Sequence, residues 1–363
     1  MIFSGTGEQV HTILNNKPLF SIMSQNEIKD LGEFSLIDRI KKTAGMVPKN
    51  SRVLLGIGDD AALFKLSPGK ICAATTDTMV EGVHFDLGYT SFVDLGWKVM
   101  ASNLSDIAAM GGNPLLALVT LALPAKTSVR QIDQLYAGMQ ALAKKHGVVI
   151  AGGDIVKSRE LSITLALLGE CDPKNTGLRS GARPGDAVLV TGELGGSQAG
   201  LELLKSTLRL RSGQEIKNKK SKLAWKHLHP TPRVAEGQLL ASRFKLHGMI
   251  DISDGLASEL HHLSKASKVG IIIDQGALPV AEQAMVIGKR LGREPLNYCL
   301  FGGEEYELLF TLPAREALKA RTLIQKQGTA CTIIGQVVKG GQVSIIAQNG
   351  KREKLTNQGY THF

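Results

Sequence analysis

The chain has 363 residues, which is more than one ordinary hydrophobic core holds and suits two domains of about 150 residues each. Hydrophobic residues make up 43% and charged residues 21%, a balance that excludes a disordered or fibrous chain. The formal net charge is +10. There are 40 glycines, which predict many tight turns and close backbone approaches of the kind that phosphate sites need.

The first half of the chain alternates predicted helices and strands. Residues 1–32 are interpreted as an extension, in which Met23 is an alternative start to Met1. Apolar residues at helical spacing predict helices over 32–42, 92–110 and 130–146. Runs rich in Val, Ile, Leu and Thr predict strands over 52–57, 70–76, 115–123, 148–150 and 161–168.

A polar stretch at 171–185 is the predicted domain boundary. Beyond it, strands are predicted over 187–191, 249–252, 270–273, 308–311, 331–336 and 342–347. Helices are predicted over 198–205, 232–242 and 257–264. The sequence therefore predicts an α/β protein of the α+β type with two α/β domains, 33–172 and 173–363, after the extension.

Several features of the sequence indicate the cellular compartment of the protein. The first thirty residues lack the apolar stretch of a secretory signal, and no apolar run is long enough to span a bilayer. The four cysteines are far apart and form no C-x-x-C pair, which argues against a disulfide framework or a zinc site. We therefore expect a cytoplasmic protein that does not enter the membrane.

Much of the positive charge lies in one segment. Residues 205–226 contain eight lysines and arginines against one glutamate, a local charge of +7. A solvated insertion between two helices is the favoured interpretation, and a patch that binds nucleic acid or another polyanion is the alternative. A nucleic-acid site would need aromatic residues among the basic ones, and Trp225 is the single candidate in this segment.

Acidic residues recur directly after apolar runs or on mostly apolar helices. Each could cap a helix or start a turn, but five such motifs in one chain point to a shared role. Oxygen ligands without His or Cys favour Mg²⁺, and magnesium clusters usually serve polyphosphates. The motifs are Gly58-Asp59-Asp60, Thr75-Thr76-Asp77, Asn103-Leu104-Ser105-Asp106, Gly152-Gly153-Asp154 and Asp251-Ile252-Ser253-Asp254.

Two further motifs leave alternatives open. The stretch 192–197 links a strand to a helix, and it is either a phosphate cradle or a tight packing turn. Glu304, Glu305 and Glu307 precede an apolar strand and either bind a cationic or amine-bearing substrate or form a solvated strand entry. No Walker A loop, G-x-S-x-G elbow, H-E-x-x-H or D-F-G motif occurs in the sequence.

Together these motifs resemble those of the thiamine-monophosphate kinase family. GIGDDAA, TTDTMVEGVHF, ASNLSDIAAMGGNP, GGDIV, RSGARPGD, DISDGLASEL and FGGEEYELLFT follow one another in the family's order, and the resemblance covers residues 33–363. It implies an N-terminal domain with a mixed sheet that pairs across a homodimer, and a C-terminal α/β domain. The implied activity is ATP-dependent phosphorylation of thiamine monophosphate to thiamine diphosphate.

The resemblance also implies roles for particular residues. It implies contacts to ATP from Gly153, Asp154, Arg179 and Ser253, and contacts to the thiamine substrate from His84, Glu304 and Tyr360. It implies that Asp60, Asp77 and Asp154 are catalytic. The implied ligands of several Mg²⁺ ions are Asp60, Thr75, Thr76, Asp77, Asp106, Asp154, Asp251 and Asp254. The chain departs from the family at Glu305, where the family commonly has Asp.

Related ATP-dependent families are the nearest alternatives. Selenophosphate synthetase would need a reactive Cys near the N-terminus, whereas the first cysteine here is Cys72, inside a predicted strand. The hydrogenase-maturation relative would end in Cys, whereas this chain ends in Phe363. Phosphoryl transfer to a phosphate needs no strong base, since the acceptor oxygen is already anionic, and this fits the lack of an evident catalytic base.

Overall fold

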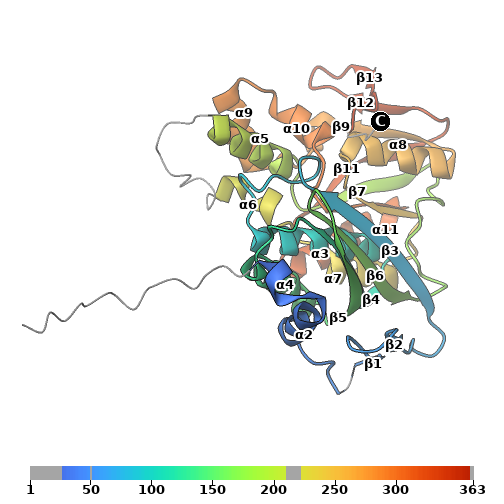
Figure 1. Ribbon diagram of the computed structural model, residues 1–363. Helices are drawn as coiled ribbons and strands as arrows, with labels where there is room; N and C mark the ends of the chain where they lie inside the picture. The colour runs from blue at the N-terminus through green and yellow to red at the C-terminus, as the bar shows by residue number, and fades with distance from the viewer. Residues whose placement is uncertain (1–26, 50, 210–221, 360–363) are drawn as a thin grey trace, which may run out of the picture.

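The computed structural model describes residues 27–49, 51–209 and 222–359. In Figure 1 the first half of the chain, blue to green, packs against the second half, yellow to red. The elements of the first half are α1 (Ile28–Leu31), α2 (Glu33–Ala44), β1 (Val53–Leu55), β2 (Leu63–Phe64), β3 (Ile71–Val80), α3 (Phe92–Ala109), β4 (Asn113–Leu123), α4 (Val129–Lys145), β5 (Val149–Lys157) and β6 (Ser162–Cys171).

The long helices of the first half begin where the sequence supplies a capping residue. Ser91 accepts a hydrogen bond from the Asp94 amide, and the Asp94 carboxylate accepts one from the Ser91 amide, so both orphan donors are satisfied. Ser128 and Gln131 form the same reciprocal pair at the start of α4. Gly111, with φ of 65°, follows the end of α3, where a glycine commonly ends a helix.

Four strands of the first half form a mixed sheet in the order β3-β6-β4-β5. β4 and β5 run parallel, and the other neighbours are antiparallel. Burial alternates along β6, so that Ile163, Leu165 and Leu167 are fully buried while their neighbours are partly exposed. Buried residues of α2, α3 and α4 belong to the same hydrophobic cluster as these three residues. The three helices therefore cover one face of the sheet, part of the other face packs against β1 and β2, and β3 and β5 are the edges.

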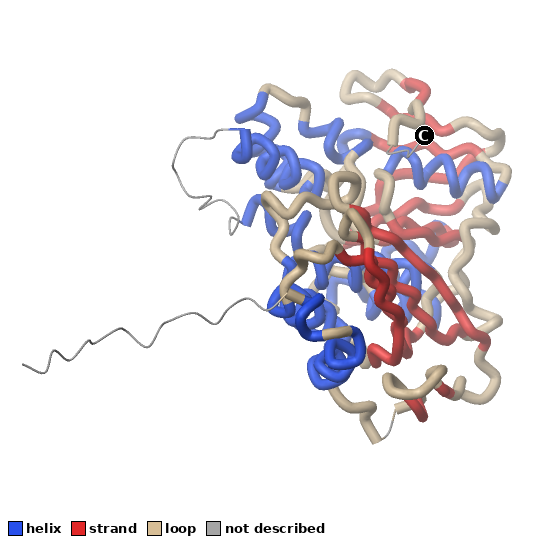
Figure 2. Tube along the Cα trace, viewed as in Figure 1, coloured by secondary structure: helices blue, strands red, loops and turns tan. Residues whose placement is uncertain are grey.

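The second half contains a seven-stranded sheet in the order β13-β12-β9-β11-β7-β10-β8, with helices beside it (Figure 2). One hydrophobic cluster contains residues of both halves, such as Leu104 and Phe310. The elements are β7 (Asp186–Thr191), α5 (Gly196–Arg209), α6 (Lys222–Leu228), α7 (Val234–Arg243), β8 (Gly248–Asp251), α8 (Leu256–Ser267), β9 (Gly270–Asp274), η2 (Gln275–Ala277), α9 (Glu282–Leu291), α10 (Pro295–Phe301), β10 (Leu308–Pro313), α11 (Ala314–Lys326), β11 (Cys331–Val338), β12 (Val343–Ile346) and β13 (Arg352–Lys354).

The prediction of a mixed α/β fold is confirmed, and each helix or strand predicted in the described residues has an observed counterpart. α6, α9, α10 and α11 were not predicted. In α11 the buried residues are Ala317, Ala320 and Ile324, and two small alanines give a weak periodic signal. The short helix α1 lies inside the predicted extension, of which residues 1–26 are outside the described part. Within the described residues, no helix combines the length and apolar character needed to cross a bilayer.

Candidate functional site

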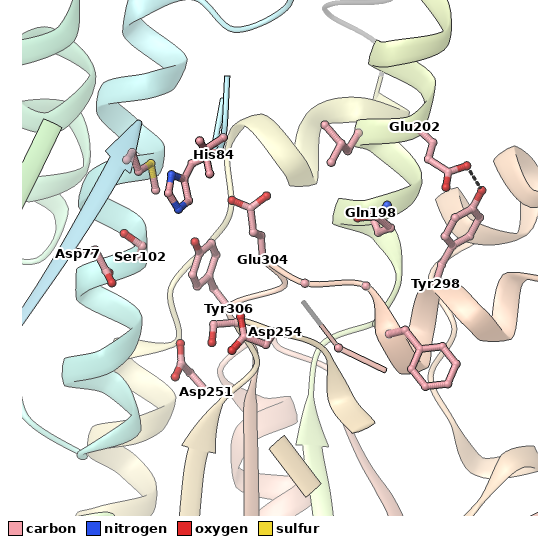
Figure 3. Close-up of a pocket in the computed structure, with 18 of the residues that line it drawn as sticks. Asp77, His84, Ser102, Gln198, Glu202, Asp251, Asp254, Tyr298, Glu304 and Tyr306 are labelled. Carbon is pink, nitrogen blue, oxygen red and sulfur yellow. Dashed lines mark hydrogen bonds between the residues drawn. The ribbon is translucent and has the colours of Figure 1, made fainter. Parts of the chain in front are cut away.

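A cavity of about 1070 Å³ lies between the two halves of the chain. Its walls come from the end of β3 and the loop after it, from α3, α5 and α10, from the turn after β8, and from residues 302–304 and Tyr306. Figure 3 shows Asp77, Ser102 and Asp251 on one side, His84, Glu304 and Tyr306 in the middle, and Gln198, Glu202 and Tyr298 on the other side. The cavity therefore joins an acidic wall to a mixed polar and aromatic wall.

Three carboxylates form the acidic wall, and each is held by a hydroxyl group. The Thr75 hydroxyl donates to Asp106 Oδ2 at 2.5 Å, and the Ser105 hydroxyl donates to Asp251 Oδ2 at 2.7 Å. Asp77 lines the same cavity. Burial raises the pKa of Asp77, and the neighbouring Ser102 hydroxyl and His84 oppose that rise in part.

Burial and mutual repulsion raise the pKa of Asp106 and of Asp251 as well. Asp251 raises the pKa of Asp106, Asp77 raises the pKa of both, and the positive charge of Arg179 partly offsets these effects. Buried carboxylates that repel one another offer the oxygen ligands that a hard divalent cation prefers, and a bound cation would relieve their repulsion. In the described residues, however, no group of three His, Cys, Asp or Glu side chains already stands in a metal-binding arrangement.

The turn between β8 and α8 brings Ser253 and Asp254 to the cavity. Gly255 follows with φ of 110°, and a Cβ there would lie 2.9 Å from the backbone of Phe301, so glycine is required at this point. The Asp254 amide donates to Glu259 Oε1 at 3.1 Å. Burial, with help from Asp251, raises the pKa of Glu259 to about 8, which adds one more acidic group behind the acidic wall.

His84, Glu304 and Tyr306 line the cavity beside the acidic wall. The Val80 amide donates to His84 Nδ1 at 3.1 Å, so the proton of the neutral ring is on Nε2. Glu304 and Tyr306 have positive φ values of 61° and 52°, which are uncommon for residues with side chains and cluster at functional sites. Backbone bonds from their amides to Ser253 and Ile252 hold this conformation.

Glu305 and Glu307 do not face the cavity, and the interpretation of a solvated strand entry is wrong for both, since each is 1% exposed. Glu305 Oε1 accepts from the amides of Gly195 and Ser197 at 2.9 and 3.0 Å. The start of α5 is therefore occupied by a carboxylate of this chain, which favours the packing turn over the phosphate cradle. Lys226 Nζ lies 2.9 Å from Glu305 Oε2 and 3.2 Å from Glu307 Oε1.

Arg233 completes this buried network. Its Nε and Nη2 donate to the two oxygens of Glu307 at 2.6 and 2.7 Å, and Thr191 donates to the same carboxylate at 2.8 Å. Burial alone would raise the pKa of Glu307, but Lys226 and Arg233 lower it to about 2. The basic segment 205–226 thus ends in a buried ion pair at Lys226. At its other end Lys205 lines the cavity, and residues 210–221 between them are outside the described part.

The structure brings most of the predicted site residues together, but not all. Thr75 reaches the site through Asp106, and Arg179 acts on the acidic wall through its charge. Asp60 is exposed in the loop between β1 and β2, and Asp154 is exposed on β5. Tyr360 lies outside the described residues, although Gln358 and Gly359 line the cavity. The residues at the cavity are Thr76, Asp77, His84, Asp106, Asp251, Ser253, Asp254 and Glu304.

Gly153 and Asp154 lie within β5 instead of at its end, because the strand continues to Lys157 beyond the predicted 148–150. A register shift between β4 and β5 near Ala117 precedes them. A Cβ at Gly153 would lie 1.8 Å from the carbonyl oxygen of Val119, so the close approach of two strands requires glycine there.

Sequence reasoning missed Lys98 and His227. Lys98 is 1% exposed and lies 2.7 Å from Glu304, while His227 is 2% exposed and lies 3.3 Å from Lys98. Lys98 lies in the mostly apolar helix predicted over 92–110, where a charged side chain is as unexpected as the aspartates singled out in the sequence. The sequence could therefore have identified Lys98 as a candidate. His227 lies in α6, a short helix that was not predicted.

Comparison with known proteins identifies the family of the chain. The models for the N-terminal and C-terminal domains of AIR synthase related proteins match residues 58–171 and 183–348. Thiamine-monophosphate kinase of Bacillus subtilis (strain 168) is 38% identical over 92% of this chain and 100% of its own length.

Two solved structures are similar along most of the chain. Thiamine-monophosphate kinase from Stenotrophomonas maltophilia K279a has a TM-score of 0.76 at 33% identity and covers 88% of this chain and 97% of its own. AaThiL complexed with AMPPCP and TMP has a TM-score of 0.70 at 35% identity and covers 93% of this chain and 99% of its own. The chain belongs to the thiamine-monophosphate kinase family.

Proposed function

We propose that this protein transfers the γ-phosphoryl group of ATP to thiamine monophosphate and forms thiamine diphosphate and ADP. The observation that carries the proposal is a cavity lined by Asp77, Asp106 and Asp251 together with His84 and Glu304. Relatives that match nearly the whole chain have this activity in their names, and one solved relative is described as complexed with AMPPCP and TMP. An acidic site for metal-bound polyphosphate beside a site for a cationic substrate suits this reaction.

The chain's own residues would align two anions. An oxygen of the thiamine monophosphate phosphate attacks the γ-phosphorus of ATP, the bond from that phosphorus to the bridging oxygen breaks, and ADP leaves with the bond's electrons. The attacking oxygen has no proton to lose at neutral pH, so no general base is required. Ser253, Gly153 and Arg179 are proposed to bind ATP, while His84 and Glu304, with Tyr360, are proposed to bind the thiamine part.

The carboxylates that surround the cavity fit a divalent metal. Their raised pKa values follow from burial and mutual repulsion, which a bound cation would relieve. We propose that Asp77, Asp106, Asp251 and Asp254, with Thr75 and Thr76, hold Mg²⁺, and that Asp60 and Asp154 complete the metal set. When bound, Mg²⁺ would neutralise the charge on the transferring phosphate.

We further propose a cytoplasmic homodimer in which the four-stranded sheets of two copies pair. β3 and β5 are unpaired edges in the described part of the chain, and they expose Ile71 and Val156 at 47% and 45%. Exposed apolar edges are normally paired or covered. Edge-to-edge pairing would also bring Asp154, which lies on β5, next to β3 of a second copy. This would give a role to a carboxylate that does not line the cavity of its own chain.

The assay that tests the proposed function incubates the purified protein with ATP, Mg²⁺ and thiamine monophosphate and separates the products by chromatography. We expect thiamine diphosphate and ADP in equal amounts. Thiamine without its phosphate is the control acceptor, and we expect it to yield no thiamine diphosphate. ATP hydrolysis without transfer to thiamine monophosphate would overturn the proposal.

A further inference from the structure

Lys98 is a fully buried cation in the middle of α3. Its neighbours Leu95, Val99 and Ala101 are fully buried, and its own side chain is 1% exposed. A buried ammonium group is tolerated when a counter-charge and hydrogen bonds replace its water shell. Lys98 Nζ lies 2.7 Å from Glu304 Oε1 and 3.3 Å from His227 Nε2, so its two polar partners belong to the second half of the chain.

His227 is held in one tautomer by this contact. An ammonium group has donors and no acceptor, so His227 Nε2 must accept from Lys98, and the ring proton is on Nδ1. Nδ1 lies 3.2 Å from the Ser197 hydroxyl and 3.4 Å from Glu304 Oε2. Burial and the charge of Lys98 lower the pKa of His227 well below its usual range, so the ring is neutral near pH 7.

Glu304 is therefore held at both carboxylate oxygens. Lys98 contacts Oε1, His227 lies near Oε2, and the backbone amide of Glu304 donates to Ser253 at 2.7 Å. The side chain is still 28% exposed, and it lines the cavity. Figure 3 shows this carboxylate close to His84 and Tyr306. Its remaining lone pairs face the space that a ligand would fill.

Such a carboxylate suits one kind of ligand group. It accepts hydrogen bonds and attracts positive charge, and it repels phosphate. Thiamine monophosphate has an amino group on its pyrimidine ring and a positive charge on its thiazolium ring. Lys98 also balances the charge that Glu304 would otherwise add to a cavity that already holds Asp77, Asp106 and Asp251.

We propose that Lys98 and His227 are positioning residues, which orient the Glu304 carboxylate toward the amine-bearing, cationic part of the acceptor substrate. This inference rests on the proposed function, because thiamine monophosphate is taken as the acceptor. Neither residue lines the cavity in which the phosphates would react. Their loss should therefore weaken binding of the acceptor and spare the binding of ATP and the transfer step.

The test compares Lys98→Met with the wild-type enzyme. Methionine matches the unbranched lysine side chain as far as Cε and removes the charged ammonium group. We expect KM for thiamine monophosphate to rise at least about tenfold, while KM for ATP and kcat stay within about threefold. Lys144→Met, the same change at an exposed position of α4, is the matched control and should alter none of these constants. A rise in both KM values, or a loss in kcat alone, would overturn the proposal.

A double-mutant cycle separates positioning from a purely structural role. If Lys98 acts through Glu304, Lys98→Met should raise KM for thiamine monophosphate no further in a Glu304→Gln background. The double variant leaves no buried charge unpaired. It can therefore still be compared with Glu304→Gln if Lys98→Met alone does not fold. Independent, additive effects of the two substitutions would contradict the proposal.

Direct titration of thiamine monophosphate into each folded variant gives the same comparison without turnover. If the wild-type protein binds thiamine monophosphate but makes no thiamine diphosphate, the proposed function is contradicted. The double-mutant cycle can then still be evaluated from the binding constants. Wild-type protein that makes thiamine diphosphate but shows an additive cycle would contradict the positioning role alone.

Discussion

Asp77 and Asp154 lie on opposite faces of the same four-stranded sheet. Across the sheet, Asp77 pairs in register with Leu165, then with Val119 and Gly153, and Leu165 and Val119 are buried under the helices. Asp154 belongs to the next row, with Thr120, Thr164 and Thr78, on the other face. Three strand spacings, about 14 Å, also separate β3 from β5. One chain therefore does not bring these two aspartates together.

The first prediction tests both aspartates. Asn at position 77 or 154 keeps the size of the side chain and removes the charge, which leaves a weaker ligand for a hard cation. Each variant should lose at least about a hundredfold in turnover, near 2.7 kcal/mol. Raising the Mg²⁺ concentration should recover part of the loss, because mass action refills a weakened site. Turnover is measured against Mg²⁺ concentration for each variant.

The two variants should differ in metal-free stability. Burial raises the pKa of Asp77, so its ionised form costs folding free energy above that pKa, and Asp77→Asn should raise the metal-free Tm at pH 8. Asp154 is exposed, so Asp154→Asn should leave the metal-free Tm unchanged. Near-normal turnover would remove either residue from the metal site, and a fall in metal-free Tm would indicate a structural role.

The second prediction concerns Glu307. Gln at this position leaves Lys226 and Arg233 buried without their shared carboxylate, and we expect a loss of about 3 to 5 kcal/mol in the free energy of unfolding. The pKa of Glu307 is lowered from 4.5 to about 2, so its stabilisation is present above about pH 4.5 and is lost as the pH falls toward 2. The difference in Tm between wild type and Glu307→Gln should therefore narrow between pH 6 and pH 3. A difference that stays constant over this range would refute the ion-pair account.

The third prediction concerns Glu305, whose carboxylate holds the start of α5. Asp is one methylene shorter and would withdraw from the amides of Gly195 and Ser197, which costs about 1 to 3 kcal/mol for buried donors left without a partner. We expect Glu305→Asp to lower Tm by several degrees. Because Glu305 does not line the cavity, KM for thiamine monophosphate should change less than about tenfold. An unchanged Tm with a larger change in KM would place this residue in the substrate site instead.

The fourth prediction tests the proposed dimer. Val156 is 45% exposed on the edge strand β5, and lysine at an edge opposes pairing with another strand. Sedimentation velocity should show a dimer for the wild type and a shift toward monomer for Val156→Lys. The matched control is Leu318→Lys, at a 60% exposed position of α11, which should remain dimeric. A wild-type monomer, or an unchanged dimer for Val156→Lys, would reject pairing through this edge.

The sequence by itself determined the elements and the family. Runs rich in Val, Ile, Leu and Thr located β3 and β4 within a few residues, and helical spacing of apolar residues located α3, because these signals are local. The order of the acidic and glycine-rich motifs was enough to identify the family and most residues of the acidic wall. Asp77, Asp106 and Asp251 were found in this way, since a carboxylate in an apolar context is conspicuous without any structure.

Only the tertiary structure decided which side chains meet and which are buried. Asn103 and Asp106 are three residues apart on α3, yet Asp106 lines the cavity while Asn103 is 0% exposed and bonds to the Val99 carbonyl. Glu304 and Glu305 are adjacent, yet one faces the cavity and the other caps α5. The ion pair of Lys98 with Glu304 joins distant parts of the chain, and long-range packing rather than local spacing sets the charge and burial that each group experiences.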